Sequence, residues 1–236
     1  MNNFNNAQSS IANLSQAQID EGLRSHMLRV YNYMSAALAL TGIVAWFSAT
    51  SGLYVAIANT MLIYVVMFAP LGVVFYFASK INSMSASKAQ SVFWVFAGLM
   101  GLSLSSILLV YTGMSVTRVF FICSATFGAM SIYGYTTKRD LTKLGSFLMM
   151  GLIGIIIASI VNIFMKSSMM YFVISILGVL IFVGLTAYDT QKIKNMYAVS
   201  DTGEVMGKKA VMGALTLYLD FINLFIMLLR LFGQRR

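Results

Sequence analysis

Residues 169–194, MMYFVISILGVLIFVGLTAYDTQKIK, and residues 210–232, AVMGALTLYLDFINLFIMLLRLF, are two consecutive apolar segments that each carry one aspartate. Both exceed the roughly 20 residues that an α-helix needs to cross the hydrocarbon core of a bilayer. Asp189 and Asp220 therefore fall inside predicted membrane helices, where insertion scales assign a central aspartate a penalty of about 2.5–3.5 kcal/mol. A penalty of this size indicates side chains that face protein or water and serve transport, proton relay or catalysis.

Five further apolar segments precede these two. They lie at residues 30–50, 54–79, 91–111, 116–136 and 144–165. Only 10% of the 236 residues are charged and 59% are hydrophobic, whereas soluble domains carry about 25% charged residues. We therefore predict an all-α membrane protein, with a polar N-terminal tail over residues 1–27 and a seven-helix transmembrane domain over residues 28–236. The tail lacks the features of a signal peptide, so the first helix is expected to act as an uncleaved anchor.

The sixteen Lys and Arg residues predict the orientation. With seven crossings, eleven lie on the side of the N-terminus and five on the other: Arg118, Lys166, Arg230, Arg235 and Arg236. Cytoplasmic loops carry the excess of Lys and Arg, so we expect a multi-pass protein of the inner (cytoplasmic) membrane with a cytoplasmic N-terminus. If the last segment were re-entrant, the split would be fourteen against two, so six spans plus a returning helix stays an alternative.

The net charge of +9 does not predict nucleic-acid binding. The basic residues are scattered between apolar segments and form no patch with interleaved aromatic residues. We expect membrane lipids as their partners, through anionic headgroups, and no nucleic acid. Cys123 is the only cysteine, which excludes an internal disulfide and a Cys-based metal site, and we expect no cofactor. His26, the only histidine, is expected to be a solvated residue of the polar tail.

Helix packing is predicted from loop lengths and small residues. Short connections near residues 51–53, 112–115 and 166–168 favour tight antiparallel hairpins between segments one and two, three and four, and five and six. Small residues four apart, such as Ser124 with Gly128 and Gly154 with Ala158, favour close approach of helices. Pro70 is expected to kink the second segment.

The two aspartates are predicted to meet. The midpoint between them falls at Glu204 and Val205, inside a polar loop, so each lies about fifteen residues from the same turn. Consecutive membrane helices are antiparallel, which brings the two carboxyl groups to similar depth. On the last segment, Asp220 belongs to a polar stripe at helical spacing that should face the sixth segment: Gly213, Thr216, Asp220, Asn223, Met227 and Arg230. On the sixth segment, Thr186 lies one turn before Asp189.

Two carboxylates in contact in an apolar interior cannot both ionise cheaply, so we expect Asp189 and Asp220 to share one proton over some range of pH. Loss of that proton would create two repelling anions and an oxygen-rich site suited to a hard cation such as Ca²⁺. Thr186, Thr216 and Asn223 are candidate supporting residues. The alternative is a structural hydrogen bond without further function.

The residues also resemble a known family. Gly184-Leu-Thr-Ala-Tyr-Asp-Thr-Gln-Lys192 and Leu217-Tyr-Leu-Asp-Phe-Ile-Asn-Leu-Phe225 resemble the Bax inhibitor family, also called the transmembrane Bax inhibitor motif family. Gly128-Ala-Met-Ser-Ile-Tyr-Gly-Tyr-Thr-Thr-Lys-Arg-Asp140 is similar to its bacterial inner-membrane branch. The resemblance covers the chain from about residue 25 to the C-terminus.

This resemblance implies two three-helix layers around a central seventh helix. It also implies a pH-sensitive Ca²⁺ leak whose two sensor aspartates correspond to Asp189 and Asp220, with Ca²⁺ and protons as partners. Some members carry an arginine cluster at the cytoplasmic end of the second helix that latches one aspartate. Here that end reads Phe77-Ala-Ser-Lys80, so Lys80 is at best a partial substitute.

Two other function classes compete with the leak channel. An intramembrane aspartyl protease also uses two aspartates on neighbouring helices. Such enzymes need a Gly-x-Gly-Asp motif and a later Pro-Ala-Leu element, whereas this chain has Leu217-Tyr-Leu-Asp220 and a single proline, Pro70. We therefore assign no catalytic residues. The other class is an interaction protein that regulates a membrane-bound protease, with the N-terminal tail as its contact; deletion of residues 1–20 would then abolish that role and leave ion flux intact.

Overall fold

The structure is a computed structural model that describes residues 16–236, and the described part is almost entirely helical. Its helices are α2 (Gln16–Thr50), α3 (Leu53–Ala58), α4 (Leu62–Lys80), α5 (Ala86–Val110), α6 (Gly113–Thr136), α7 (Thr142–Met165), α8 (Ser168–Asn195) and α9 (Gly203–Phe232). All of them except the short α3 are long and apolar enough to cross a membrane, which makes 7 candidate spans. The predicted all-α, seven-helix class is confirmed.

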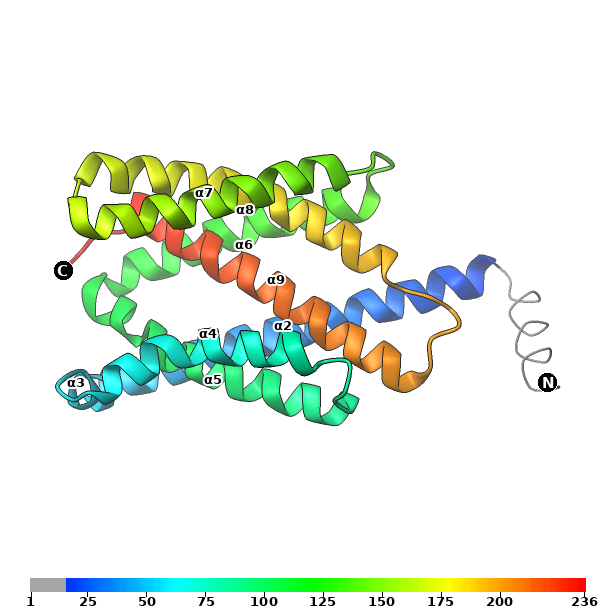
Figure 1. Cartoon of the computed structure of the whole chain (residues 1–236), viewed down its shortest axis with the longest axis horizontal. Coiled ribbons are helices and arrows are strands. Elements are labelled where there is room, and N and C mark those ends of the chain that lie inside the picture. The colour runs from blue at the N-terminus through cyan, green and yellow to red at the C-terminus, as the bar shows by residue number, and fades with distance from the viewer. Residues whose placement is uncertain (1–15) are drawn as a thin grey trace.

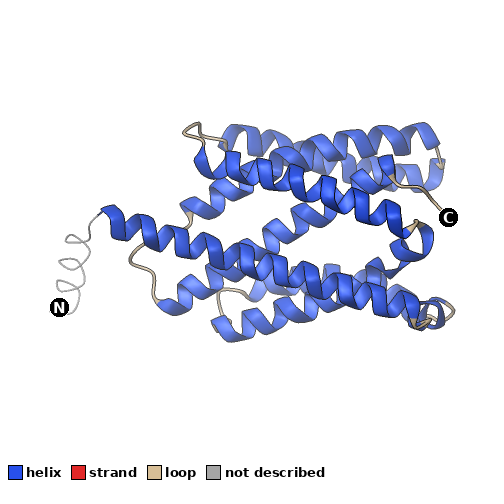
Figure 2. Cartoon of the chain, turned by 180° about the vertical axis from the view of Figure 1, so that it is seen from behind, coloured by secondary structure: helices blue, strands red, loops and turns tan. Residues whose placement is uncertain are grey.

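The helices form two layers with α9 between them, as Figure 1 shows. Helices α2, α4 and α5 form the first layer, and α6, α7 and α8 form the second. Helix α9 contacts α2 and α5 on one side and α6 and α8 on the other. The start of α2 and the C-terminal end of the chain lie at opposite ends of the bundle (Figures 1 and 2).

Helix α9 runs diagonally from the first layer to the second. A Cβ atom on Gly207, near its start, would meet Ala86 of α5, whereas Arg230, near its end, lies over the Tyr171 ring of α8. Most of α9 is buried, while α4 and α7 expose large apolar side chains such as Phe75 and Phe147. Apolar surface of this extent is expected where helices face lipid, whereas α9 carries the polar stripe and lies in the interior, where polar side chains avoid lipid.

Several boundaries differ from the sequence prediction. Helix α2 begins at Gln16, so residues 16–27, assigned to the polar tail, continue the first membrane helix; residues 1–15 lie outside the described residues. The predicted second segment is divided into α3 and α4, because residues 59–61 do not continue the helix. Pro70 lies inside α4, which extends on both sides of it.

Helix α9 is continuous from Gly203 to Phe232, which argues against the re-entrant alternative.

The predicted hairpins are correct for one pair only. Helices α7 and α8 pack along each other, as their short connection predicted. Within the described residues, however, α2 has no extended contact with α4 and packs on α5, while α6 leaves α5 and packs on α8 and α9. The hairpins predicted from the two other short loops are therefore wrong. A tight turn fixes where the next helix begins but not the direction in which that helix tilts.

The glycines that allow close packing are also not the predicted ones. A Cβ atom built on Gly128 or on Gly154 would meet nothing within 4 Å. By contrast, a Cβ atom on Gly134 of α6 would collide with the backbone carbonyl of Ala187 on α8. Helices α6 and α8 therefore do approach closely, but they do so at Gly134, about one and a half turns along α6 from the predicted Gly128.

His26 contradicts the expectation of a solvated histidine. Its side chain is only 2% exposed, since α2 is already helical there and packs under the connection between α8 and α9. The Tyr197 ring lies 5.8 Å away, centroid to centroid. Neither ring nitrogen has a hydrogen-bond partner among the described residues. The polar composition of residues 1–27 therefore gave no indication that His26 is a core residue.

Candidate functional site

Asp189 of α8 and Asp220 of α9 face each other in the interior of the bundle. They are 8% and 5% exposed, respectively. Their carboxyl groups are near enough to form a side-chain hydrogen bond and to interact directly as charges. Two acidic side chains from consecutive helices therefore occupy one buried site.

The helix register explains why these two residues meet. On one side of the pair, Gly213 of α9 lies against Ile193 of α8; on the other, Met227 of α9 lies against Gly178 of α8. The partners change in opposite directions along the two helices, as antiparallel packing requires. Gly213, Asp220 and Met227 all belong to the polar stripe predicted on the last segment, and these three members contact α8.

Protonation decides whether this contact is favourable. An ionised carboxylate only accepts hydrogen bonds, so two ionised groups cannot bond to each other. With both groups ionised, Asp220 Oδ2 is buried without a hydrogen-bond partner among the described residues. A single proton on either carboxyl group supplies the missing donor, and the pair can then form one hydrogen bond between α8 and α9.

Polar contacts with the loop between α6 and α7 fix α8 close to Asp189. The Gln191 side chain donates to the Arg139 carbonyl (2.8 Å) and accepts from the Leu141 amide (2.9 Å). One turn further, Lys194 Nζ donates to the Tyr135 carbonyl (2.8 Å) and lies over the Tyr135 ring. Helix α8 is thereby attached to the rest of its own layer on the N-terminal side of the bundle.

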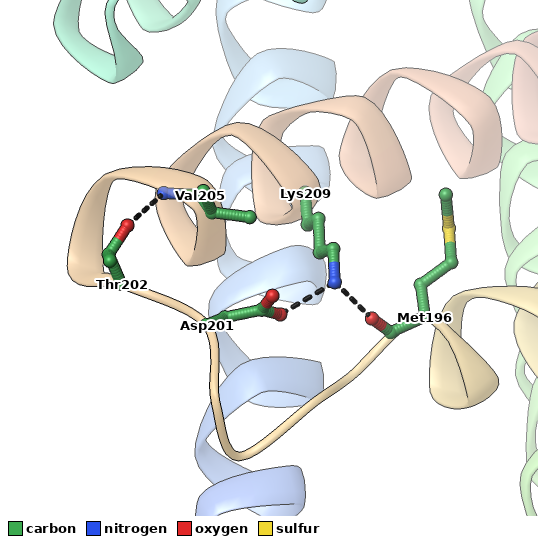
Figure 3. Close-up of polar contacts among 5 residues, drawn as sticks. All are labelled: Met196, Asp201, Thr202, Val205 and Lys209. Carbon is green, nitrogen blue, oxygen red and sulfur yellow. Dashed lines mark hydrogen bonds and ion pairs between the residues drawn. The ribbon is translucent and has the colours of Figure 1, made fainter. Parts of the chain in front are cut away.

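The connection between α8 and α9 is held by one lysine, which Figure 3 shows. Lys209 Nζ donates to Asp201 Oδ2 (2.6 Å) and to the Met196 carbonyl (2.8 Å). Thr202 caps the start of α9 by accepting from the Val205 amide. These contacts set the angle at which α9 leaves α8, and hence the register that brings the aspartates together.

The three predicted supporting residues bond to their own helices. Thr186 Oγ1 donates to the Phe182 carbonyl (2.7 Å), Thr216 Oγ1 to the Met212 carbonyl (3.1 Å), and Asn223 Nδ2 to the Leu219 carbonyl (2.8 Å). None of these bonds reaches an aspartate. Thr186 is fully buried beside the pair, whereas Thr216 and Asn223 are half-buried.

Lys80 is not part of this site. It is exposed at the end of α4, a helix that packs mainly on α5, and within the described residues it makes no contact with Asp189 or Asp220. The cation that acts on Asp189 is Lys192, one turn along α8, whose Nζ lies 5.9 Å from the centre of the Tyr188 ring. The Asp-x-x-Lys spacing on one helix is the sequence signal that could have identified it.

Thr190 is a second residue that sequence reasoning missed. It follows Asp189 directly, is fully buried, and its Oγ1 has no hydrogen-bond partner among the described residues. Buried hydroxyl groups are usually hydrogen-bonded, so an unpartnered one marks a position where water or an ion can bind. The Asp-Thr dipeptide inside an apolar segment is the only signal for it in the sequence.

The site can offer a cation few protein ligands. No group of three or more His, Cys, Asp or Glu side chains that could hold a metal occurs between residues 16 and 236. Ca²⁺ takes 6–8 oxygen ligands. The two carboxylates supply fewer oxygen atoms than this, so the described residues form no closed Ca²⁺ cage around them.

Comparisons with known proteins agree with this architecture. The family model described as "Inhibitor of apoptosis-promoting Bax1" matches residues 23–236. The chain is 54% identical over 218 residues to a protein of Rickettsia prowazekii, covering 92% of each chain. It is 46% identical over 219 residues to the inner membrane protein YbhL of Escherichia coli, covering 91% of this chain and 94% of that protein. A protein of Caulobacter vibrioides is 44% identical over the full length of both chains.

Proposed function

This chain belongs to the Bax inhibitor family, and from that premise we propose that it is a pH-sensitive cation leak channel, with Ca²⁺ as its cargo and the Asp189–Asp220 pair as its gate. The observation that carries the proposal is the contact between two buried carboxyl groups on consecutive helices. The interaction between the two carboxyl groups depends on protonation. It is attractive when they share a proton and repulsive when both are negatively charged.

The energy at stake is large enough to move helices. Two unit charges about 4 Å apart interact by about 4 kcal/mol at an effective dielectric constant of about 20. One hydrogen bond to a charged group contributes about 1.5–3 kcal/mol. Loss of the proton thus replaces an attraction of a few kcal/mol between α8 and α9 by a repulsion of similar size, which a cation entering between the carboxylates would relieve.

Buried oxygen atoms on α8 and α9 that have no partner in the described part of the chain support a transient cation site. Asp220 Oδ2 and Thr190 Oγ1 are buried and without protein partners within residues 16–236, so both are available to water or a cation. The Lys192 ammonium group, one turn away, competes with a bound cation for the Asp189 carboxylate. Weak binding of this kind permits release as well as entry, which conduction requires.

Ca²⁺ flux into proteoliposomes, measured across acidic and alkaline pH, tests the proposal. The variants Asp189→Asn and Asp220→Asn keep the shape of each side chain and remove its charge, so each should flatten the pH dependence of flux. Asp140→Asn is the matched control, because Asp140 is exposed in the loop between α6 and α7. If both pair variants keep the wild-type pH profile, the pair is not the gate.

We also propose that the chain lies in the inner membrane with a cytoplasmic N-terminus. YbhL, at 46% identity, bears the name of an inner membrane protein, and the eleven-to-five distribution of Lys and Arg supports the orientation. Reporter fusions that are active only in the periplasm or only in the cytoplasm should place the C-terminus in the periplasm. A cytoplasmic C-terminus would contradict the seven-crossing topology.

A further inference from the structure

A cavity of about 570 Å³ lies at the end of the bundle that is opposite to the start of α2. It is bounded by the connection between α7 and α8 and by the C-terminal end of α9. Three cationic residues line it, together with polar side chains and an aromatic ring; we call it the basic pocket, and the residues that matter are Lys166, Arg230, Arg235, Asn162, Ser167 and Tyr171. Its volume lies in the range of small-molecule sites, about 300–1,000 Å³.

No acidic side chain neutralises these cations. All seven Asp and Glu residues of the chain lie elsewhere: Asp189 and Asp220 in the core, and Asp20, Glu21, Asp140, Asp201 and Glu204 towards the N-terminal side. The terminal carboxylate of Arg236 is at this end, but Arg236 does not line the cavity. Three cations that face one cavity without a carboxylate repel one another, so an anion that entered would be stabilised by all three.

The two arginines are held in place by aromatic and polar neighbours. The Arg230 guanidinium lies over the Tyr171 ring, 5.0 Å from its centre, and Arg235 lies over the Tyr111 ring at 6.0 Å. Arg230 Nη1 also contacts Met227 Sδ (3.9 Å), and Arg235 hydrogen-bonds to Tyr111 and Tyr171. A guanidinium has five N–H donors, so each arginine keeps donors for a planar or tetrahedral oxyanion.

Hydrogen bonds fix the C-terminal backbone on both sides of Arg235. The Gln234 amide donates to Ser115 Oγ (2.8 Å), and the Thr112 amide donates to the Gln234 carbonyl (3.0 Å). The Arg236 amide donates to the Val110 carbonyl (2.9 Å). Residues 233–236 are thus attached to the connection between α5 and α6, which positions Arg235 beside a pocket formed mainly by α7, α8 and α9.

Lys166 provides a second, independent observation. Its φ angle is +50°, in the left-handed region, and it is the only residue other than glycine with a positive φ in the described part of the chain. Glycine adopts this conformation without steric cost, whereas a side chain does not. Asn162 holds the turn, accepting from the Lys166 amide (2.8 Å) and from the Ser167 amide (3.0 Å). What the lysine adds over glycine is its ammonium group at the rim of the pocket.

We propose that the basic pocket binds the phosphate group of an anionic ligand, most simply that of a phospholipid headgroup. The start of α8, a helix of 28 residues, adds its positive dipole end through Ser167 and Ser168, which line the cavity. The rim beside it is apolar and open, with Phe164 82% exposed and Met169 70% exposed. Acyl chains can therefore lie along α7 and α8 while the phosphate occupies the pocket.

The distribution of charge supports this assignment. Lys and Arg are disfavoured on the non-cytoplasmic side of inner-membrane proteins. Of the five such residues that the chain places opposite to the N-terminus, three line this one cavity. A specific anion would explain why cations gather at one pocket on the non-cytoplasmic side. Lys and Arg residues that only determine topology would instead be spread over the cytoplasmic loops.

Binding of fluorescent phosphatidylglycerol to the purified protein in a neutral detergent tests the proposal, with unlabelled phosphatidylglycerol and inorganic phosphate as competitors. The double variant Lys166→Gly, Arg230→Gln should weaken phosphatidylglycerol binding about tenfold or more, since each lost charge-assisted contact has a large effect on affinity. Arg118→Gln is the matched control, because Arg118 is an exposed arginine on the same side and outside the pocket. It should bind like the wild type.

The competitors separate the two sources of phosphate. Displacement by unlabelled phosphatidylglycerol but not by millimolar inorganic phosphate supports a lipid headgroup, and displacement by both supports a phosphate site that also accepts a soluble ligand. Lys166→Gly alone relieves the left-handed lysine, so its thermal midpoint should not fall, which separates lost binding from lost folding. Equal binding by the wild type and the double variant, or equal loss in Arg118→Gln, overturns the proposal.

Discussion

The hydroxyl oxygens of Tyr218 and Thr41 lie 2.7 Å apart in the interior, and this contact joins α9 to α2. Thr41 Oγ1 also donates to the Ala97 carbonyl of α5 (2.9 Å), so the Tyr218 hydroxyl must be the donor to Thr41. Tyr218 precedes Asp220 by two residues, and α9 is therefore attached to the first layer at the level of the aspartate pair. Any separation of Asp189 from Asp220 moves the second layer relative to α9 or breaks this contact.

Removal of the Tyr218 hydroxyl should be mild, and removal of its acceptor more severe. Tyr218→Phe deletes one buried hydrogen bond and should lower the free energy of unfolding by about 1 kcal/mol. Thr41→Val leaves the buried Tyr218 hydroxyl unpartnered and should cost about 2 kcal/mol. Equilibrium unfolding in detergent measures both, and the double variant should cost less than the sum; additive effects would mean that the two hydroxyls do not interact.

Gly134 and Gly128 should respond in opposite directions to alanine. Gly134→Ala places a methyl group against the Ala187 carbonyl, and forcing α6 from α8 should cost about 1–3 kcal/mol. Gly128→Ala, on the same helix, meets no atom within 4 Å and should be neutral or slightly stabilising, because alanine favours the helix. Thermal midpoints in detergent compare them; a larger loss at Gly128 would contradict the observed contact between α6 and α8.

Lys209 should control the order of the connection between α8 and α9. Lys209→Met removes two short hydrogen bonds and leaves Asp201, whose side chain is only 12% exposed, without its cation, so the free energy of unfolding should fall by about 2 kcal/mol. Hydrogen exchange of residues 196–202 should accelerate as well. Lys208→Met is the control, since Lys208 Nζ donates to the Asn82 carbonyl at 3.4 Å and has no other hydrogen-bond partner among residues 16–236, so this variant should change stability by less than about 0.5 kcal/mol.

Asp140 should contribute stability that disappears in acid. Its Oδ1 accepts from Thr142 Oγ1 (2.6 Å) and from the Thr142 amide (2.9 Å), and these bonds hold the pKa of Asp140 below its ordinary value of 3.8. Because the folded pKa is depressed, the contribution is present above pH 3.8 and is lost as the pH falls through the folded pKa. Helix α7 should then fray at its start.

NMR titration of the Asp140 carboxyl group provides the measurement. Thr142→Val removes the hydroxyl donor and keeps the amide, so the pKa of Asp140 should move back up towards 3.8. Ser146→Ala, one turn further along α7, is a control, because the Ser146 hydroxyl donates to the Thr142 carbonyl and not to Asp140. An unchanged Asp140 midpoint in Thr142→Val would rule out the hydroxyl as the main cause.

Much of the chain could be predicted from its residues, because lipid imposes a length and a polarity on every crossing. The seven spans and the exceptional positions of Asp189 and Asp220 follow from the cost of placing polar groups in hydrocarbon. The polar stripe on the last segment was informative for the same reason: among apolar residues, Asp220 and Asn223 mark the face that avoids lipid.

The arrangement of the helices was decided only by the tertiary structure. Lipid tails and the protein core are equally apolar, so hydrophobicity does not reveal which face of a membrane helix packs against protein. Hence the chain alone did not distinguish Gly134, which contacts α8, from Gly128, which meets nothing, nor did it reveal that His26 is buried or that Lys192 rather than Lys80 lies near Asp189. Steric fit between distant segments settled those contacts, and no local pattern in the sequence encodes that fit.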